Sequence, residues 1–252
     1  MREIQLKAPP AGRGIPRHPA LWRGGELARM AQPGVASGFA ELDAALPGGG
    51  WPVAALTELM PAHEGIGELR LLGGALAALA RKGQHLAWIA PPHLPYAPAL
   101  AAAGIRLGQL LVVRTKTVQE TLWATEQALR SNACGAVLAW PAPGIDYTQL
   151  RRLQVAAEGS RALAFLFRPP AASQQASPAV LRLLLDTDRG GLAVTVAKRR
   201  GAPLTHPVLI PALGFRLPRV ASATAAATPS PIITSPNTPH ALDRHPPAAA
   251  AA

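Results

Sequence analysis

Apolar and polar positions form regular blocks along residues 32–219, and their spacing alternates between two periods. In residues 68–81 the leucines recur every three or four positions, which is typical of an amphipathic helix. Residues 136–140 form an unbroken apolar run, as strands of a buried parallel sheet do. Strands are expected at 53–60, 85–90, 110–114, 136–140 and 161–167, and helices at 68–81, 96–103, 117–131 and after Asp146. This alternation predicts an α/β fold with a mostly parallel sheet flanked by helices.

The pattern changes after residue 180. Three strands are expected at 181–185, 192–196 and 208–210, with no helix between them. The segment DTDRGG joins the first two and has the glycines of a hairpin turn, in which Asp186 and Asp188 are expected as turn residues. The sheet is therefore predicted to end in antiparallel strands.

Two of the expected helices begin with a capping residue. Thr117 precedes Glu120 by three positions, which is the spacing of a capping box. Asp146 is the expected N-cap of the helix that contains Leu150 and Leu153. The predicted first residues of these two helices are therefore supported by capping side chains as well as by the periodicity.

The composition divides the chain into three parts. Residues 1–31 begin with a Pro-, Gly- and Arg-rich stretch and are expected to form an N-terminal arm. Residues 32–219 carry the alternating pattern of the core. Residues 220–252 consist mainly of Ala, Thr, Pro and Ser, cannot bury enough apolar surface to offset their ordering entropy, and are expected to be a disordered tail.

The chain is basic. It has 25 Lys and Arg against 14 Asp and Glu, for a formal net charge of +11. Such a balance favours nucleic acid or an acidic protein surface as partner. Lys198, Arg199 and Arg200 form a basic cluster after an expected strand, and they are candidate DNA contacts. The alternative is that they are the solvated end of that strand.

Cys134 is the single cysteine, which excludes a disulfide within the chain and fits a reducing compartment. Its place in an apolar run indicates a core residue rather than a nucleophile. No apolar run reaches the roughly 18 residues of a membrane span, and residues 1–14 lack the apolar region of a secretory signal. A cytoplasmic protein without a membrane partner is expected.

Residues 35–60, VASGFAELDAALPGGGWPVAALTELM, resemble the beginning of the RecA core. In RecA-like proteins a Ser/Thr-Gly-x-x-x-Leu-Asp segment precedes a glycine-rich turn, a strand and the phosphate loop. The matching residues are Ser37, Gly38, Leu42, Asp43, Gly48, Gly49 and Gly50. The elements then keep a similar order through about Pro169. The resemblance implies a RecA-like α/β fold.

The phosphate loop is where the chain departs from this pattern. A phosphate loop reads Gly-x-x-x-x-Gly-Lys-Ser/Thr; its backbone cradles phosphate, its lysine reaches the terminal phosphates and its hydroxyl holds Mg²⁺. The corresponding residues here are Ala62, His63, Glu64, Gly65, Ile66, Gly67, Glu68 and Leu69. Glu68 stands at the lysine position and Leu69 at the hydroxyl position, so a carboxylate would face phosphate and the metal ligand is lost.

Two acidic positions of the RecA pattern are also replaced. The Walker B acid falls on Ala139 or Trp140, and the catalytic glutamate falls near Pro92 or His93. The lysine and Mg²⁺ carry most of the charge stabilisation in phosphoryl transfer. The combined losses predict a chain that is not an ATPase, with no catalytic residues and no cofactor.

His63 and His93 are expected near each other at one edge of the sheet, with Glu64 and Glu68 nearby. A metal site would need further ligands at suitable spacing. Solvated loop histidines are the simpler interpretation, and no metal is expected.

The segments HPALWRGGELA and KRRGAPLTHPVLIPAL, on either side of the altered core, resemble the ImuA family of RecA-related bacterial proteins, which are also grouped with SulA-like proteins. The resemblance implies a non-catalytic accessory protein in SOS-induced, error-prone translesion DNA synthesis. It also implies an ImuB-like protein, an error-prone C-family polymerase and RecA as partners. Leu21, Trp22 and Arg23 are the candidate partner-binding residues. The alternative for Trp22 is packing onto the core.

Two other functions stay open at this point. One is a RecA-like ATPase that uses unusual residues, against which the replaced positions argue. The other is a SulA-like inhibitor of cell division that binds FtsZ and has no role on DNA.

Overall fold

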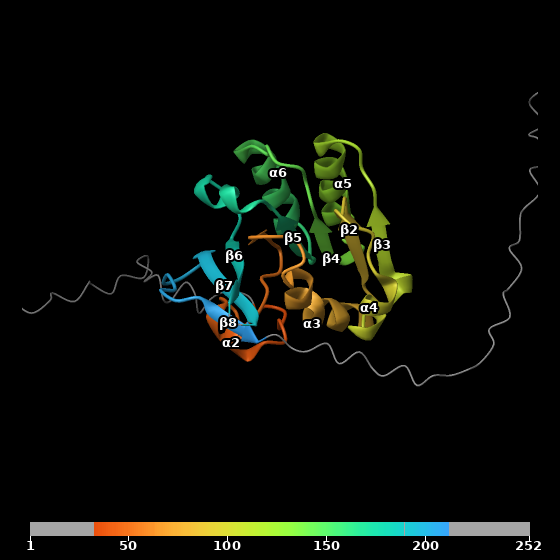
Figure 1. The fold of residues 1–252 in the computed structure, drawn as a ribbon. Coiled ribbons are helices and arrows are strands. Elements are labelled where there is room, and N and C mark those ends of the chain that lie inside the picture. Colours follow the sequence, from red (N-terminus) through yellow and green to blue (C-terminus); the bar gives the residue numbers. More distant parts are fainter. Residues whose placement is uncertain (1–32, 189, 212–252) are drawn as a thin grey trace, which may run out of the picture. The chain divides into compact units, whose positions relative to one another are not determined.

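Eight strands form one sheet in the computed structural model, which describes residues 33–188 and 190–211 (Figure 1). Within these residues the strand order is β3-β2-β4-β5-β1-β6-β7-β8. The strands are β1 (Ala55–Pro61), β2 (His85–Ile89), β3 (Leu110–Val113), β4 (Cys134–Ala139), β5 (Leu163–Phe167), β6 (Leu181–Asp188), β7 (Gly191–Lys198) and β8 (Val208–Pro211). The α-helices are α2 (Ala40–Ala45), α3 (Glu68–Arg81), α4 (Ala97–Ala102), α5 (Val118–Arg130) and α6 (Tyr147–Glu158), and two 3-10 helices are η1 (Leu107–Gln109) and η2 (Pro170–Gln174).

The predicted fold class is confirmed. Strands β1 to β6 pair in parallel, and β7 and β8 complete the sheet in antiparallel order. The central strand β1 lies between β5 and β6, with Thr57 paired to Phe165 on one side and to Leu181 on the other. All six residues of β4 are buried, as expected for an apolar run covered on both faces.

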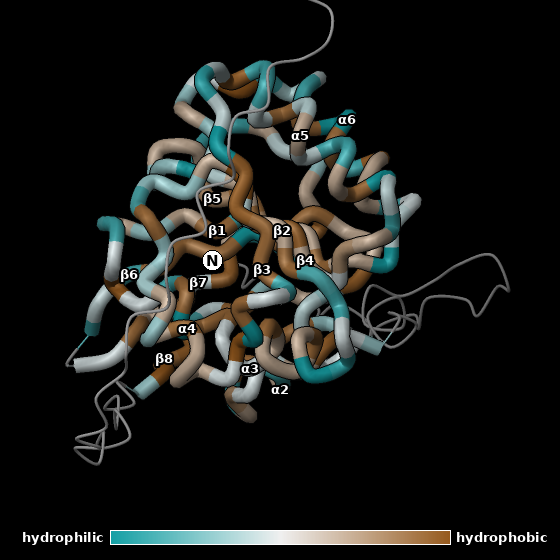
Figure 2. The backbone as a smooth tube through the Cα atoms, turned by 90° about the vertical axis from the view of Figure 1, so that its right-hand side faces the viewer, coloured by the Kyte–Doolittle hydropathy of each residue, from teal (hydrophilic) through white to brown (hydrophobic). Residues whose placement is uncertain are grey.

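Helices cover both faces of the sheet, α3 on one side and α5 and α6 on the other (Figure 1). Successive residues of a strand point to opposite faces, so each central strand contributes to two apolar layers. The layer on the α3 side includes Leu59, Leu72, Leu76, Trp88, Leu138 and Phe165. The layer on the α5 and α6 side includes Leu56, Ile89, Leu129, Val137, Leu153 and Leu166. Figure 2 shows these strands as largely apolar traces inside a more hydrophilic periphery.

The two predicted helix starts are confirmed. Thr117 accepts a hydrogen bond from the Glu120 N–H at 3.1 Å, although the Glu120 carboxylate accepts from the N–H of Lys116 rather than from that of Thr117. Asp146 and Gln149 form the complete reciprocal pair of a capping box, at 2.8 and 3.0 Å. Side-chain acceptors therefore satisfy N–H groups that the first helical turn leaves unpaired.

The predicted position of the first hairpin turn was wrong. Asp186 and Asp188 lie within β6 rather than in a turn, because the pairing with β7 continues to Asp188 and Gly191. Only two residues separate these paired positions, so the hairpin is tighter than the segment DTDRGG indicated. The Asp186 carboxylate accepts from the N–H of Thr187 at 2.7 Å, the local bond that makes aspartate common in turns.

The residues that match the beginning of the RecA core form a short helix that the periodicity did not reveal. In α2 the side chain of Leu42 is fully buried, and the Asp43 carboxylate accepts from the N–H of Ser37 at 2.8 Å. The glycine-rich turn follows, where Gly50 lies against the backbone of Val35; a Cβ at this glycine would come within 2.4 Å of the Val35 carbonyl oxygen. This segment therefore depends on contacts that only a glycine permits.

Candidate functional site

A cleft of about 680 Å³ opens at the carboxyl ends of β1, β2, β4 and β5. This is the edge where open α/β sheets bind their ligands. Four connecting segments line it: residues 61–69 after β1, 90–96 after β2, 140–143 after β4 and 168–170 after β5. The cleft is therefore built by loops that follow parallel strands, and its volume is in the range of small-ligand pockets.

The segment expected in place of a phosphate loop, residues 62–69, connects β1 to α3 at this edge. Glu68 is the first residue of α3, and its carboxylate folds back over the loop. Its two oxygens accept hydrogen bonds from the N–H groups of Gly65 and Gly67, both at 3.0 Å. Gly67 is the N-cap of α3 and Gly65 lies two residues before it, at the end of the helix where a negative charge is favoured. The Glu68 carboxylate thus occupies two backbone donors of this loop.

The neighbouring loop residues divide between the core and solvent. Leu69, at the hydroxyl position, is half-buried and packs against the apolar layer on the α3 side. Ile66 packs against the same layer. His63 and Glu64 are exposed at the rim of the cleft. Leu69, expected at the hydroxyl position of a phosphate loop, therefore has a packing role.

A contact between Glu64 and His93 joins two loops of the cleft. The Glu64 carboxylate lies 2.9 Å from His93 Nε2, and both side chains are largely exposed. His63 and His93 thus line the same cleft, as the sequence predicted, but the observed partner of His93 is Glu64. Throughout residues 33–188 and 190–211, no group of three or more His, Cys, Asp or Glu side chains is arranged to hold a metal ion.

Aromatic rings form one wall of the cleft. Trp140 and Phe167 stack with ring centroids 4.4 Å apart and an interplanar angle of 5°, and Trp88 lies 5.7 Å from Trp140. The indole N–H of Trp88 is buried and has no acceptor among the described residues. Trp140 directly follows β4, where the Walker B acid was sought, so an apolar ring stands near that position.

Prolines form much of the remaining surface of the cleft. Eight line it: Pro61, Pro91, Pro92, Pro95, Pro141, Pro143, Pro169 and Pro170. Proline has no backbone N–H, so these loops offer few donors to an anion. These prolines were not predicted as part of a site, although the segments PPHLP, PAP and RPP each follow an expected strand.

A buried charge network lies behind the cleft. Glu58 of β1 is fully buried and forms ion pairs with Arg168 at 3.2 Å and Arg182 at 2.6 Å. Ser177 donates a further hydrogen bond to the same carboxylate at 2.7 Å. Arg182 also donates to the carbonyl oxygens of Ala172 and of Gln175. The network ties the segment after β5 to the central strand, and nothing in the periodicity predicted it.

The predicted basic cluster is largely engaged in internal hydrogen bonds. Lys198 donates to the carbonyl oxygen of Ser177 at 2.8 Å, and burial, with Arg182 nearby, lowers the pKa of its ammonium group while Glu58 opposes this shift. Arg199 donates to the carbonyl oxygens of Ala202 and Ala45. Arg200 is exposed. The partner-binding candidates Leu21, Trp22 and Arg23 lie outside the described residues.

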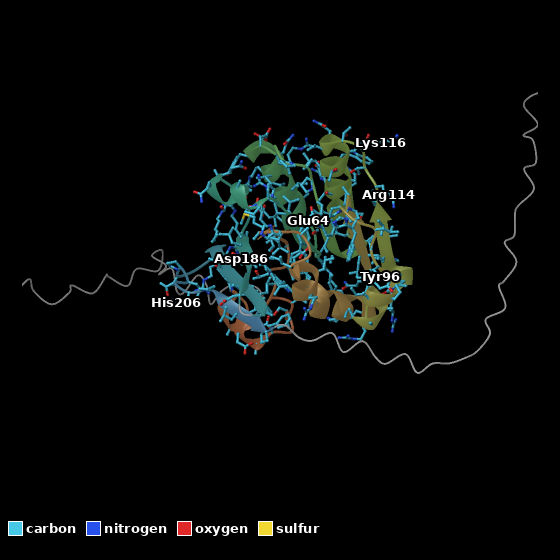
Figure 3. All side chains as sticks on the ribbon, viewed as in Figure 1. Glu64, Tyr96, Arg114, Lys116, Asp186 and His206 are labelled. Carbon is cyan, nitrogen blue, oxygen red and sulfur yellow. The ribbon has the colours of Figure 1, made fainter. Side chains whose placement is uncertain are left out.

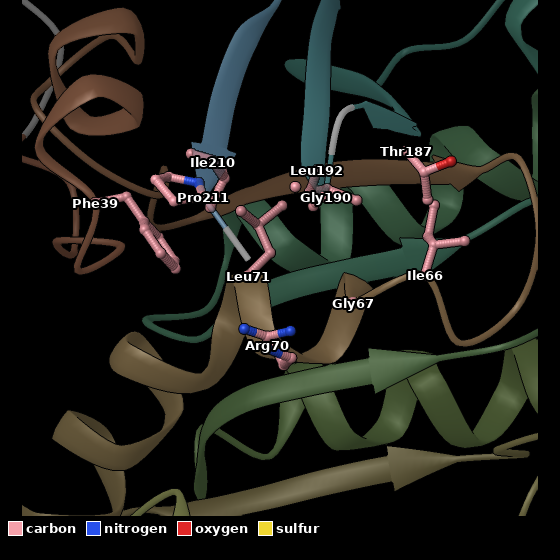
Figure 4. A pocket seen from close by; sticks show the side chains of 11 residues that line it. Phe39, Ile66, Gly67, Arg70, Leu71, Thr187, Gly190, Leu192, Ile210 and Pro211 are labelled. Carbon is pink, nitrogen blue, oxygen red and sulfur yellow. The ribbon is translucent and has the colours of Figure 1, made fainter. Parts of the chain in front are cut away.

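A second, smaller cavity of about 230 Å³ lies near the start of α3 (Figure 4). Ile66, Leu71, Leu192 and Ile210 contribute apolar side chains to its lining, and Arg70 contributes a basic one. It adjoins the same loop as the main cleft but is bordered by the β6–β7 hairpin. Its size is below that of most ligand pockets, so the main cleft is the better candidate site.

The chain is similar to known proteins named ImuA and SulA. Protein ImuA of Caulobacter vibrioides, in strain NA1000 / CB15N and in strain ATCC 19089 / CIP 103742 / CB 15, is 32% identical to this chain over 139 residues. The resemblance to ImuA proteins is confirmed. The cell division inhibitor SulA of Edwardsiella piscicida is 31% identical over 99 residues, which agrees with the expected ImuA and SulA-like grouping.

These matches cover part of each protein. The ImuA match spans 52% of this chain and 55% of the relative, and the SulA match spans 39% and 58%. The chain thus spans somewhat more than half the length of the relatives that it matches. No family model matches the chain. Among the described residues, the helices all fall short of the length and hydropathy that a membrane span needs.

Proposed function

We propose that this chain is a non-catalytic accessory protein of the DNA-damage response, active in error-prone translesion synthesis through protein–protein contacts. Its partners are an ImuB-like protein, an error-prone C-family polymerase and RecA. The similarity to ImuA supports this assignment. The geometry of the cleft supports the non-catalytic part of it.

The observation that carries the proposal is the position of the Glu68 carboxylate. It accepts from the N–H groups of Gly65 and Gly67 at the head of α3. A nucleotide phosphate placed there would have to displace this carboxylate and then lie beside its negative charge. Two unit charges about 4 Å apart repel by about 4 kcal/mol at the effective dielectric of a protein surface. The loop is therefore held in place by Glu68 without a bound phosphate, and the Glu68 carboxylate opposes phosphate binding.

The rest of the cleft gives no compensation for this repulsion. The acidic positions that would hold Mg²⁺ and orient water are expected on or beside Trp140 and His93, and half-buried Leu69 packs against the core. Phosphoryl transfer depends on positioning and on charge stabilisation by metal and cation, so a site without them has little to accelerate the reaction with. An adaptor that keeps the shape of the core and binds proteins is the function that fits.

Nucleotide binding provides the first experiment. Full-length protein is titrated with MgATP by calorimetry and assayed for ATP hydrolysis with and without single-stranded DNA. We expect neither binding nor hydrolysis. A matched variant, Glu68→Lys with Leu69→Thr, restores two residue types of the phosphate loop and tests whether the carboxylate blocks the site. ATP hydrolysis by the unaltered chain that Glu68→Ala abolishes would overturn the proposal.

Partner capture provides the second experiment. The tagged full chain is expressed in cells treated with a DNA-damaging agent, and bound proteins are identified by mass spectrometry. We expect an ImuB-like protein, its polymerase or RecA, with capture reduced by Trp22→Ala and unaffected by Trp123→Ser, a change at an exposed tryptophan of α5. If none of the three partners is captured from cells treated with the DNA-damaging agent, the translesion role is contradicted.

The similarity to the SulA of Edwardsiella piscicida supports a second candidate, a cell-division inhibitor that binds FtsZ. Overexpression of the chain without DNA damage distinguishes the two functions. Filamentous cells and recovery of FtsZ alone would favour the inhibitor. Normal division together with recovery of an ImuB-like protein would favour the accessory role.

A further inference from the structure

The cleft at the carboxyl ends of β1, β2, β4 and β5 is suited to an apolar occupant. Its wall is the half-buried ring of Trp140, which stacks on Phe167 and has Trp88 beside it; these two rings are 5% and 2% exposed and lie behind Trp140. The proline-rich loops around it supply apolar surface and few backbone donors. Because prolines restrict the backbone, these loops also lose little conformational freedom when a ligand binds. A preformed, largely apolar cavity of about 680 Å³ accommodates one or two large side chains.

The apolar surface continues beyond the cleft. Leu94 and Tyr96 line its mouth, and their side chains are 75% and 70% exposed. Both belong to the segment between β2 and α4, and the side chains of Tyr96 and Glu64 can be found in Figure 3. A small molecule held inside the cavity would leave these two side chains in water. A peptide chain that crosses the mouth would cover them, so the arrangement favours a polypeptide.

Of the Asp, Glu, Lys and Arg side chains that line the cleft, two are acidic, Glu64 and Glu68, and one is basic, Arg168; Arg114 lines a neighbouring cavity. Glu64 is exposed at the rim, and Glu68 carries a second carboxylate in the same loop. The cation Arg168 is already paired with buried Glu58. The exposed contact between Glu64 and His93 contributes little stability, so it can be exchanged for another partner. A basic side chain of the occupant is thus complementary to Glu64, whereas an anion is repelled.

We propose that this cleft binds a short segment of a partner protein that carries an aromatic or branched aliphatic side chain next to Lys or Arg. The apolar side chain enters against Trp140, in front of buried Trp88, the segment crosses Leu94 and Tyr96, and its cation lies against Glu64. This inference rests on the proposed function as a protein-binding accessory factor, and it names the surface and the chemistry of the bound segment. The carboxyl edge of the sheet would then serve to bind a protein segment.

Tryptophan side-chain NMR provides the test, because two of the five tryptophans line the cleft. The full chain, labelled with ¹⁵N at the indole nitrogens, is titrated at about pH 7.5, where an ordinary histidine is mostly neutral. The probe is the capped pentapeptide Gly-Leu-Phe-Arg-Gly. Gly-Leu-Phe-Glu-Gly and Gly-Ser-Ser-Arg-Gly are the matched controls for charge and for apolar character. Trp51 in the core and Trp123 on α5 serve as internal references, and Trp→Phe variants assign the signals.

We expect the arginine peptide to shift the Trp88 and Trp140 signals saturably, and to bind about three- to five-fold more tightly than the glutamate peptide, as one exposed ion pair allows. Glu64→Gln should abolish this difference, while Glu158→Gln on α6 should leave it unchanged. Tyr96→Ser should weaken binding by about three-fold or more, and Trp123→Ser should not. Both substituted side chains are exposed, so folding is preserved.

Other outcomes would overturn the inference. These are the absence of saturable shifts, shifts confined to Trp123, or equal binding of all three peptides. Displacement of the peptide by MgATP would make the cleft a nucleotide site and refute the proposed function as well. If ImuB-like partners are captured from cells equally by the unaltered chain and by Tyr96→Ser with Glu64→Gln, the inference fails and the accessory function stands.

Discussion

The buried carboxylate of Glu58 should be the most sensitive polar group of the core. The change Glu58→Gln keeps the shape of the side chain, so it creates no cavity; it removes the charge and turns one acceptor oxygen into an NH2 donor that faces other donors. In the native protein Glu58 faces two guanidinium groups, at 2.6 and 3.2 Å, and accepts from Ser177 at 2.7 Å. Without the carboxylate, Arg168 and Arg182 become two buried like charges without a counter-ion.

The expected loss follows from that imbalance. Breaking a buried ion pair by removing one partner costs about 3–5 kcal/mol, because the remaining charge is desolvated without compensation. At a urea dependence of about 2–3 kcal/mol per molar, this lowers the urea midpoint by on the order of 1.5 M. The assay is equilibrium unfolding in urea, monitored by circular dichroism. The signal should report the core, since Glu58 lies on the central strand.

Glu158→Gln is the matched control. Glu158 is a half-exposed carboxylate of α6 that lies 3.8 Å from Arg151 and accepts from Gln154 at 2.9 Å. Its neutralisation should change the unfolding free energy by no more than about 0.5 kcal/mol. A loss below about 1 kcal/mol for Glu58→Gln would refute the reasoning, since it would mean that the two arginines are adequately solvated without their carboxylate.

Three further predictions concern single side chains. The pKa of Lys198 is lowered in the folded protein, so between that pKa and 10.5 the unfolded chain binds more protons than the folded one. The free energy of unfolding should therefore rise with pH in this window. Urea unfolding of Lys198→Met at several pH values should show a smaller rise than the unaltered chain. Burial raises the pKa of Cys134, so its reaction with a thiol-specific reagent at about pH 8 should be slow until denaturant is added. Asp146→Ala removes the cap of α6 and should cost about 1 kcal/mol in urea unfolding, whereas Asp186→Ala, at an exposed strand residue, should cost less.

Local chemistry made much of the fold predictable. The helix at Glu68–Arg81 has the predicted bounds, because its periodicity is strong over fourteen residues. The start of α6 was predicted from Asp146, whose side chain satisfies backbone donors that are set by the helix geometry alone. Strand β4 begins two residues earlier than expected, at Cys134, because the pairing with His85 of β2 extends it there.

The site was less accessible to sequence reasoning because its parts are distant along the chain. The segment 62–69 could be placed from the order of the elements, and it does connect β1 to α3. The partners of Glu58 are 110 and 124 positions away, and no local pattern connects them. The pairing of Glu64 with His93 and the stacking of Trp140 on Phe167 likewise depend on which strands are neighbours in the sheet. Such contacts follow from topology rather than from periodicity.

The residues at the carboxyl edge of the sheet share one chemical character. A phosphate site needs backbone donors, a cation and a metal ligand at the ends of adjacent strands. Here Glu68 occupies the donors, Leu69 packs inward, and an indole follows β4. Prolines at the end of β1 and after β2, β4 and β5 leave further positions of the same edge without an N–H group. Together these residues build an apolar surface with acidic groups at its rim. That is why we assign this edge to the binding of a protein segment rather than regard it as a vacant nucleotide site.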